Sequence, residues 1–298
     1  MREYSNIHVE LAPRPLETRH GLVAKSAIEL RDRQRPQADW IVEGLLKRQN
    51  TGFIMGQPKK ACKSWLLLDM AWALSEGEPV WGTALKPPRP MRTVYFTQED
   101  TEDDIHDRVL AHLGGGREPN DRLWIVPKNM NIALDTNAGK AIIAQELTEV
   151  RNVAGEIDLV MFDPFRRMHH GDENDSAVIV KLWETIDKIH KQLNCAVMIS
   201  HHIKKPPDDR TMYDPTDPFN GRGSGDIYGG GDAFVMVVPG HGNESARKLT
   251  AHFESKRGKP IPPAQLKVTY GTGRVELEGM GWPRSSNESE AVAREVKL

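Results

Sequence analysis

The feature that most constrains the fold is a short apolar run that passes through a Lys-rich turn into a helical pattern. Phe53-Ile54-Met55 precedes the turn at residues 56–64, and an apolar-periodic segment then continues to Leu74. Strand, turn, Lys-Ser and helix form the layout of a phosphate-binding loop, in which backbone N–H groups point at an anion. This layout predicts that Lys63 reaches phosphate oxygens and that the hydroxyl of Ser64 holds Mg²⁺.

The turn departs from the usual loop sequence at its glycines. Counted back from Lys63, the pattern G-x-x-x-x-G-K-[ST] would place glycines at Gln57 and Cys62, whereas Gly56 lies one residue too early. The alternative interpretation is a surface turn that leads into a core helix, and the downstream segments decide between the two. The candidate nucleotide-binding residues are Gly56, Lys60, Ala61, Cys62, Lys63, Ser64 and Trp65.

Length and composition limit the class of protein. A chain of 298 residues can bury a full core. The formal net charge of −2 provides no global basic field, so nucleic acid would have to be bound by local loops. Two cysteines form no disulfide framework and suit a reducing compartment, so we expect a cytoplasmic protein. We expect no signal peptide and no membrane association, because no apolar segment approaches the roughly 18 residues of a span.

Apolar runs and helical patterns alternate along the first two thirds of the chain. Strands are expected at 53–55, 93–97, 123–126, 159–162 and 196–200, and helices at 63–76, 101–113, 138–153 and 177–193. This alternation predicts an α/β fold with a mostly parallel sheet and helices on both faces. Residues 203–231 lack periodicity and are expected to form a loop. Further strands at 234–238, 249–253, 266–270 and 274–277 are expected to be antiparallel, with a hairpin turn at Gly271-Thr272-Gly273.

Acidic residues follow two of the expected strands. Asp163 ends an apolar strand in the manner of a Walker B motif, where a carboxylate can hold Mg²⁺ beside the loop serine. Glu99 is placed to act as the general base for a water molecule that attacks a phosphate. The alternatives are that Asp163 caps a loop and that Glu99 caps the next helix. We expect Thr101 to be the N-cap of the helix at 101–113, and we expect a capping role for Asp100 as well.

A pair of histidines ends the strand expected at 196–200. His201 and His202 are candidates for contact with the terminal phosphate of a nucleotide. The alternative is a metal site, but adjacent side chains on a strand point in opposite directions and no Cys or carboxylate spacing completes a zinc set.

Four of these segments occur together in the order found in one family. They are the loop that ends in Lys-Ser-Trp, Gln-Glu-Asp after the second strand, Phe-Asp-Pro, and Ser-His-His-Ile-Lys-Lys. The set resembles the RecA/DnaB-type P-loop ATPases and, within them, the RepA-like replicative helicases of plasmids, phages and mobile elements. The resemblance covers about residues 38–260, and it includes Asp172-Glu173-Asn174 and Arg222-Gly223-Ser224-Gly225.

The resemblance implies a RecA-like core that binds ATP and Mg²⁺, often in a homo-oligomeric ring such as a hexamer. Lys63 and Ser64 would bind phosphate and Mg²⁺, Glu99 would be the catalytic glutamate, and Asp163 would be the Walker B acid. His202, or His201, would sense the phosphate. Arg257, or Lys256, would reach the nucleotide of a neighbouring subunit, although Lys256-Arg257-Gly258 differs from the usual Lys-x-Arg spacing.

The resemblance also implies contact with single-stranded DNA through loops. The candidates are Arg166, Arg167, His169, His170, Lys204, Lys205 and Arg210, and the alternative is that these loops are simply solvated. We expect residues 1–37 to form an N-terminal arm with a weak helical pattern at 24–30, residues 38–280 a RecA-like ATPase domain, and residues 281–298 a flexible tail. The alternatives to a helicase are a recombination or regulatory ATPase of a mobile element and a nucleotide-binding scaffold that does not hydrolyse ATP.

Overall fold

The computed structural model describes residues 26–32, 39–128, 132–205, 213–256 and 258–278. These residues belong to two compact units, divided after residue 38. In the first unit, Ser26 and Glu29 exchange hydrogen bonds at the start of helix α1 (Ala27–Asp32), which overlaps the helical pattern expected at 24–30. Arg257, Arg210 and the expected tail at 281–298 lie outside the described residues.

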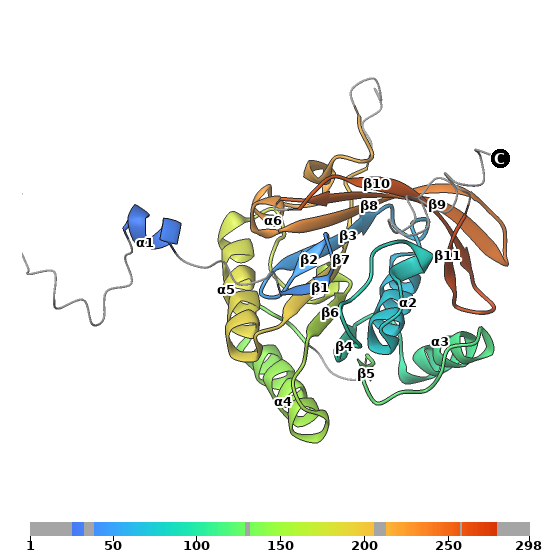
Figure 1. The fold of residues 1–298 in the computed structure, drawn as a ribbon, viewed down its shortest axis with the longest axis horizontal. Coiled ribbons are helices and arrows are strands. Elements are labelled where there is room, and N and C mark those ends of the chain that lie inside the picture. The colour runs from blue at the N-terminus through green and yellow to red at the C-terminus, as the bar shows by residue number, and fades with distance from the viewer. Residues whose placement is uncertain (1–25, 33–38, 129–131, 206–212, 257, 279–298) are drawn as a thin grey trace, which may run out of the picture. The chain divides into compact units, whose positions relative to one another are not determined.

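A nine-stranded sheet forms the centre of the second unit (Figure 1). The strand order is β11-β10-β9-β8-β3-β7-β6-β4-β5, in which the strands from β8 to β5 run parallel and β9, β10 and β11 are antiparallel. The strands are β3 (Thr51–Gly56), β4 (Thr93–Thr97), β5 (Leu123–Val126), β6 (Leu159–Asp163), β7 (Ala196–His202), β8 (Ala233–Gly242), β9 (Ala246–Ser255), β10 (Ile261–Thr269) and β11 (Val275–Leu277). This arrangement confirms the predicted fold class.

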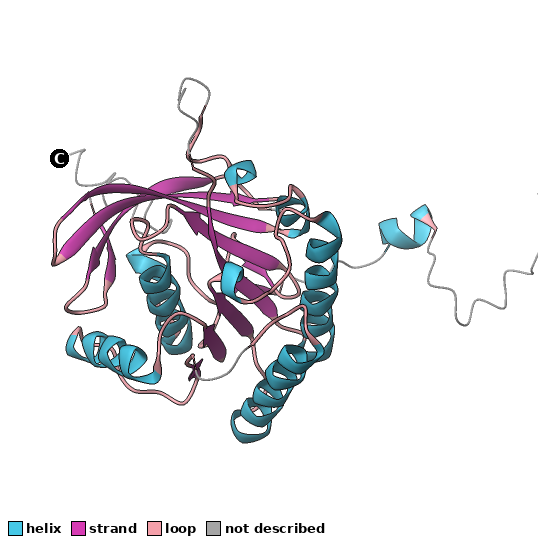
Figure 2. Cartoon of the chain, turned by 180° about the vertical axis from the view of Figure 1, so that it is seen from behind, coloured by secondary structure: helices cyan, strands magenta, loops and turns pink. Residues whose placement is uncertain are grey.

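Helices cover both faces of this sheet, as Figure 2 shows from behind. Along each parallel strand, residues alternate between two cores. Ile54, Tyr95 and Met161 pack toward α2 (Lys63–Glu76), on the same side as part of α3 (Glu102–Gly114). Their strand neighbours pack on the other face against α4 (Asn137–Ala154) and α5 (Ser176–Leu193). Because both faces are buried, the central strands are unbroken apolar runs.

The connecting segments contain one element for which no prediction was made, and they overturn one expectation. A small hairpin of β1 (Trp40–Val42) and β2 (Leu46–Lys47) precedes the sheet and was not expected, because such short strands carry no clear period. The segment expected to be a loop at 203–231 contains the 3₁₀ turn η3 (Pro218–Asn220) and the short helix α6 (Asp226–Gly230). Further 3₁₀ turns are η1 (Val80–Gly82) and η2 (Phe165–Arg167).

The cap of α3 is formed by Thr101, as predicted, and not by Asp100. Thr101 caps this helix together with Asp104, as a reciprocal pair of hydrogen bonds. Asp100, expected to be a cap, instead accepts a hydrogen bond from Arg108 at 2.9 Å. A guanidinium two turns along the helix is therefore the partner of this buried carboxylate.

A buried ion pair ties α2 to the loop after α3, and it leads to a prediction about stability. Arg117 contacts Asp69 at 3.0 Å and Glu76 at 2.5 Å, and both Arg117 and Asp69 are buried. Burial raises the pKa of Asp69 to about 6, although the charge of Arg117 opposes the rise. Arg117→Ala is therefore expected to lower the free energy of unfolding by about 3–5 kcal/mol, because it leaves an unpaired buried carboxylate.

Urea unfolding measures this effect, and Arg89→Ala is the matched control. Arg89 contacts the buried carboxylate of Asp158 at 2.7 Å, but Arg48 contacts the same group at 2.7 Å and would remain in the control variant. The control should therefore lose much less stability. If the two variants lose the same free energy of unfolding, leaving Asp69 without its partner is not especially destabilising.

Candidate functional site

The candidate site lies where the carboxyl ends of neighbouring parallel strands meet. In the sheet register, Gly56 at the end of β3 pairs with His202 of β7, and Thr97 at the end of β4 pairs with Asp163 of β6. Because the strands are parallel, the residues that follow them emerge at one edge of the sheet. Segments that are far apart in the sequence are thereby brought together.

The turn between β3 and α2 has the compact backbone of a phosphate-binding loop. A Cβ atom at Gly56 would lie 2.5 Å from that of Ala61 and 2.9 Å from the carbonyl oxygen of Val237, so only glycine fits there. Cys62, the residue before the helix, has a φ of 50°. This left-handed conformation explains why the usual loop sequence has glycine at that position. The deviation from the pattern therefore leaves the shape of the turn intact.

The ammonium of Lys63 is folded back onto this turn. Lys63 is buried at the start of α2, and its Nζ donates to the carbonyl oxygens of Gly56 at 3.2 Å and of Gln57 at 3.4 Å. Burial lowers the pKa of Lys63 to about 8, while the carboxylates of Asp163 and Glu99 oppose the shift. The lysine thus lies inside the loop, where an anion bound by the loop would replace the carbonyl oxygens as its partner.

A cavity of about 170 Å³ brings the predicted side chains together. It is lined by Lys59, Cys62, Lys63, Ser64, Trp65, Glu99, Arg108, Asp163, Pro164 and His202. Lys63, Ser64, Glu99, Asp163 and His202, the side chains predicted to handle phosphate, Mg²⁺ and water, therefore share one space. Of the other predicted loop residues, Ala61 is buried and Lys60 lines a second, larger cleft.

Asp163 is held rigidly by two hydroxyl groups. It accepts hydrogen bonds from the hydroxyl of Tyr95 at 2.6 Å and from the hydroxyl of Ser200, and it is buried. Burial raises the pKa of Tyr95 well above its ordinary value, so the phenol stays protonated and continues to donate. Tyr95 had not been predicted for the site, since its position inside an apolar strand suggested only a core residue.

The donor set fits Mg²⁺ held together with a nucleotide. Ser64 and Asp163 offer a hydroxyl and a carboxylate at the same cavity, and no group of three His, Cys, Asp or Glu ligands occurs in the described parts of the chain. Mg²⁺ commonly keeps several water molecules and binds through one or two carboxylates plus substrate phosphates, rather than in an all-protein cage. The residues present therefore suit a metal ion that arrives with its nucleotide.

Glu99 is half-exposed and is contacted by Arg167, which lies in the turn after β6. Arg167 Nε donates to Glu99 Oε1 at 3.1 Å, and the side chain of Glu99 is 45% exposed. An exposed ion pair of this kind contributes little, about 0–1 kcal/mol, so Glu99 can turn toward a water molecule in the cavity. Thr101 caps the following helix, so Glu99 has no capping role.

Arg108 is a residue of this cavity that was not predicted. It lies on α3, contacts Asp100 at 2.9 Å and lies over the ring of Trp65 at 5.0 Å from the ring centre. Its spacing of two helical turns from Asp100 could have predicted the contact between these two residues. That prediction requires knowing that Thr101, and not Asp100, caps the helix.

The two histidines of β7 have different environments. His202 lines both the small cavity and the larger cleft, and burial together with Lys63 lowers its pKa to about 4. His201 is buried, its Nε2 contacts the carbonyl oxygen of Arg222 at 2.6 Å, and burial lowers its pKa to about 3. Both rings are therefore neutral near pH 7, and only His202 borders the cavity.

Among the described residues, the other side chains predicted to contact a neighbouring nucleotide or DNA do not line this cavity. The ammonium of Lys256 donates to the carbonyl oxygens of Tyr228 at 2.6 Å and Gly229 at 3.1 Å in its own chain. His169 is buried, whereas Arg166 and His170 are exposed. Arg257 lies outside the residues that the structure describes.

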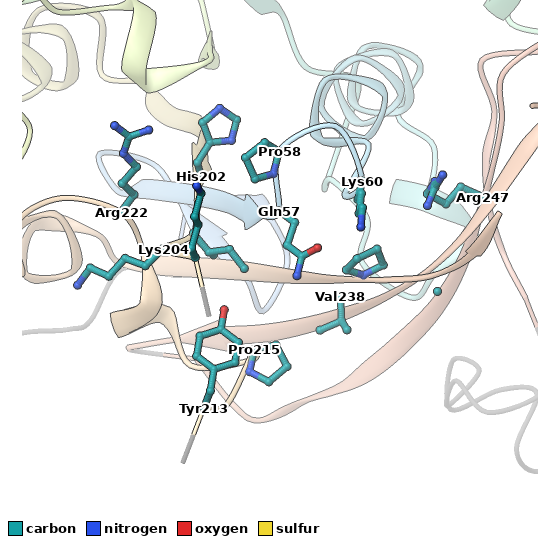
Figure 3. A pocket seen from close by; sticks show the side chains of 14 residues that line it. Gln57, Pro58, Lys60, His202, Lys204, Tyr213, Pro215, Arg222, Val238 and Arg247 are labelled. Carbon is teal, nitrogen blue, oxygen red and sulfur yellow. The ribbon is translucent and has the colours of Figure 1, made fainter. Parts of the chain in front are cut away.

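A larger cleft of about 1260 Å³ adjoins the small cavity through His202 (Figure 3). Its walls carry the cations Lys60, Lys204, Lys205, Arg222 and Arg247, and none of its described lining residues is a carboxylate. Gln57 and Lys60 point into it from the phosphate-binding turn, and Tyr213 points toward them from the opposite side. The cleft is therefore suited to an anionic ligand.

Comparison with known families agrees with this geometry. The chain matches the family model AAA_25, described as an AAA domain, over residues 12–208, which is more than half of the 298 residues. The protein therefore belongs to this AAA domain family. Membership indicates a P-loop ATPase that binds ATP, and the matched range contains the turn, Glu99, Asp163 and His202. No helix in the described part of the chain is long and apolar enough to cross a membrane.

Proposed function

We propose that this ATPase hydrolyses ATP with Mg²⁺ and couples hydrolysis to movement on, or unwinding of, DNA during replication of a mobile element. The observation that carries the proposal is the shared cavity of Lys63, Ser64, Glu99, Asp163 and His202. A lysine, a hydroxyl and two carboxylates at one sheet edge are groups that phosphoryl transfer to water uses, and the neutral imidazole of His202 lies beside them. The DNA-linked role is supported by the order of motifs in the sequence and by the adjoining cationic cleft.

Each side chain has a defined part in the proposed reaction. Lys63 exchanges the carbonyl oxygens of its loop for the β- and γ-phosphates of ATP. Ser64 and Asp163 would hold Mg²⁺, which would neutralise charge on the phosphate oxygens. Glu99 accepts a proton from the attacking water, and His202 contacts the γ-phosphate from the end of β7. Tyr95 and Ser200 keep Asp163 in place.

We further propose that the protein acts as a homo-oligomeric ring, such as a hexamer, in the cytoplasm. Arg257 would supply a cation to the nucleotide of a neighbouring subunit, whereas Lys256 is engaged with carbonyl oxygens of its own chain. A cation supplied between subunits is worth about 10³–10⁵ in rate in other systems. A fully active enzyme with the mass of a single subunit at working concentration would contradict this assembly.

Replacing Lys204 and Lys205 by Ala is expected to weaken binding of single-stranded DNA to all sequences. Both lysines are exposed in the wall of the large cleft, and neither lines the small cavity. The slope of log affinity against log salt should fall by about 0.7 for each DNA phosphate that the variant no longer neutralises. Fluorescence anisotropy over a salt series measures this effect, and basal ATP hydrolysis should be unchanged.

Lys188→Ala with Lys191→Ala is the matched control for this double variant. These two lysines are exposed on α5 and line neither the cavity nor the cleft. The control should bind DNA as the wild type does. If the variant at 204 and 205 also binds DNA normally at every salt concentration, this segment is a solvated connection. The proposal that the cleft binds DNA would then be wrong.

Two other functions are distinguished by simple measurements. A recombination or regulatory ATPase would hydrolyse ATP without separating the strands of duplex DNA. A scaffold would bind nucleotide without turnover, and Cys62 in place of the usual glycine is the feature that suggests it. The left-handed backbone at Cys62 and the shared cavity favour hydrolysis.

A further inference from the structure

Two segments that have no part in the reaction described above pack against each other. One follows β6 and contains Glu173, and the other precedes α6 and contains Arg222, Gly223 and Ser224. The amide of Ser224 donates to the carbonyl oxygen of Glu173 at 2.8 Å. Gly223 has a φ of +93°, and a Cβ atom there would lie 2.6 Å from that same oxygen, so only glycine allows this approach.

The side chain of Glu173 is buried, and few polar partners compensate for the water that its carboxylate has lost. It is 2% exposed, and neither carboxylate oxygen accepts a hydrogen bond of normal geometry from the described residues. Its closest charged partner is Arg222, whose Nε lies 2.5 Å from Oε1, while Nε2 of His169 lies 3.9 Å from Oε2. Because an unpaired buried carboxylate is costly, the position of Arg222 is the feature that makes this burial tolerable.

The backbone of Arg222 is fixed to the end of β7. Its amide donates to the carbonyl oxygen of His202 at 2.8 Å, and its own carbonyl oxygen contacts the ring of His201 at 2.6 Å. Gly221 forms a β-bridge with Ile203 immediately beside this point. The backbone of Arg222 is therefore held at His202, which borders both cavities, and its side chain is held by Glu173.

The side chain of Arg222 is 53% exposed and lines the large cleft, and Figure 3 shows its guanidinium on the same side as the ring of His202. The contact with Glu173 uses Nε. A guanidinium carries two further nitrogens beside Nε, and their planar geometry matches two oxygens of one phosphate group.

We propose that Glu173 is a positioning residue that holds the Arg222 guanidinium in the orientation that binds a phosphodiester of single-stranded DNA in the cleft. This inference rests on the proposed function, because it takes DNA as the anionic ligand. The proposal assigns the contact with the DNA phosphate to Arg222. It also gives the buried carboxylate of Glu173 a role in DNA binding, although the negative charge of this group repels DNA.

The direction in which one substitution changes DNA affinity distinguishes a positioning role of Glu173 from a simple effect of its charge. Glu173→Gln removes a negative charge near the cleft, so a field effect alone would strengthen binding of a polyanion. Positioning predicts the opposite, because a neutral amide holds the guanidinium less firmly. The expected result is a dissociation constant raised about threefold or more for Glu173→Gln and about tenfold for Arg222→Ala, a size typical of a charge-assisted contact.

The experiment measures anisotropy of a dye-labelled oligo-dT with the full chain over a salt series, together with basal ATP hydrolysis and thermal unfolding. Arg222→Ala should also flatten the salt slope by about 0.7. The double variant Glu173→Gln/Arg222→Ala should bind no more weakly than Arg222→Ala, because the two residues act through one contact. Basal hydrolysis should change less than twofold. Glu278→Gln, which loses an ion pair to Lys248 outside the cleft, is the control.

Several outcomes would overturn the inference. Binding by Glu173→Gln that equals or exceeds that of the wild type would do so, as would normal binding by Arg222→Ala. If Arg222→Ala, which leaves the buried Glu173 carboxylate without its partner, does not fold, Arg222→Lys takes its place, because it keeps the charge but lacks the fork and should still bind about fivefold more weakly. A wild-type protein that does not bind the oligonucleotide would contradict the proposed function as well, whereas unchanged variants of a binding protein contradict only the positioning role.

Discussion

Glu99→Gln is expected to keep ATP binding and to lose turnover by about 10²–10⁴-fold, the usual worth of a general base. The amide has nearly the shape of the carboxylate but cannot take a proton from water. Glu99 borders the cavity that also holds Lys63 and Asp163, and its exposed contact with Arg167 leaves it free to turn. Single-turnover hydrolysis and the binding of a fluorescent nucleotide separate the two effects.

Glu102→Gln is the matched control for this variant. It makes the same chemical change three residues later, at an exposed position in the first turn of α3 that does not line the cavity. The control should hydrolyse ATP at the wild-type rate. Turnover by Glu99→Gln within about threefold of the wild type would show that Glu99 is not the base.

Lys63→Ala is expected to weaken nucleotide binding and to lower turnover by at least about 10²–10³-fold, the cost of removing one preorganised group that stabilises charge in the transition state. The substitution leaves the phosphate charge uncompensated inside the turn, since no other lysine of the loop is buried there. Steady-state hydrolysis and nucleotide binding measure the loss.

Lys191→Ala provides the comparison, because it removes an exposed lysine in the last turn of α5 and should have no effect. Wild-type turnover by Lys63→Ala would mean that the turn between β3 and α2 does not bind phosphate, and the assignment of the whole cavity would then fail.

The elements of the sheet could be predicted from the sequence because their physical cause is local. Strands that are buried on both faces must be apolar throughout, so the runs at β4 and β6 stand out from their polar flanks. The start of α2 at Lys63 followed from the turn before it, and the turn after β10 followed from its glycines. Asp163 and Glu99 could be placed at one edge because parallel strands end together.

The partners of these groups could not be predicted, because they depend on packing between distant segments. Tyr95 meets Asp163 across 68 residues of sequence, and Ser200 meets it across 37. A polar group inside an apolar run does not reveal which carboxylate it will reach. The pairing of Glu173 with Arg222 is of the same kind, and α6 was not expected because a five-residue helix with two glycines has no apolar period.

The rate of ATP hydrolysis by the wild-type chain, measured with Mg²⁺, with a chelator, and with Mg²⁺ plus single-stranded DNA, tests the central claim most directly. The cavity of Lys63, Ser64, Glu99, Asp163 and His202 predicts turnover that requires Mg²⁺, and the adjoining cationic cleft predicts that DNA increases it. Hydrolysis no faster than that of Lys63→Ala under all three conditions would contradict the claim that this protein is an active ATPase.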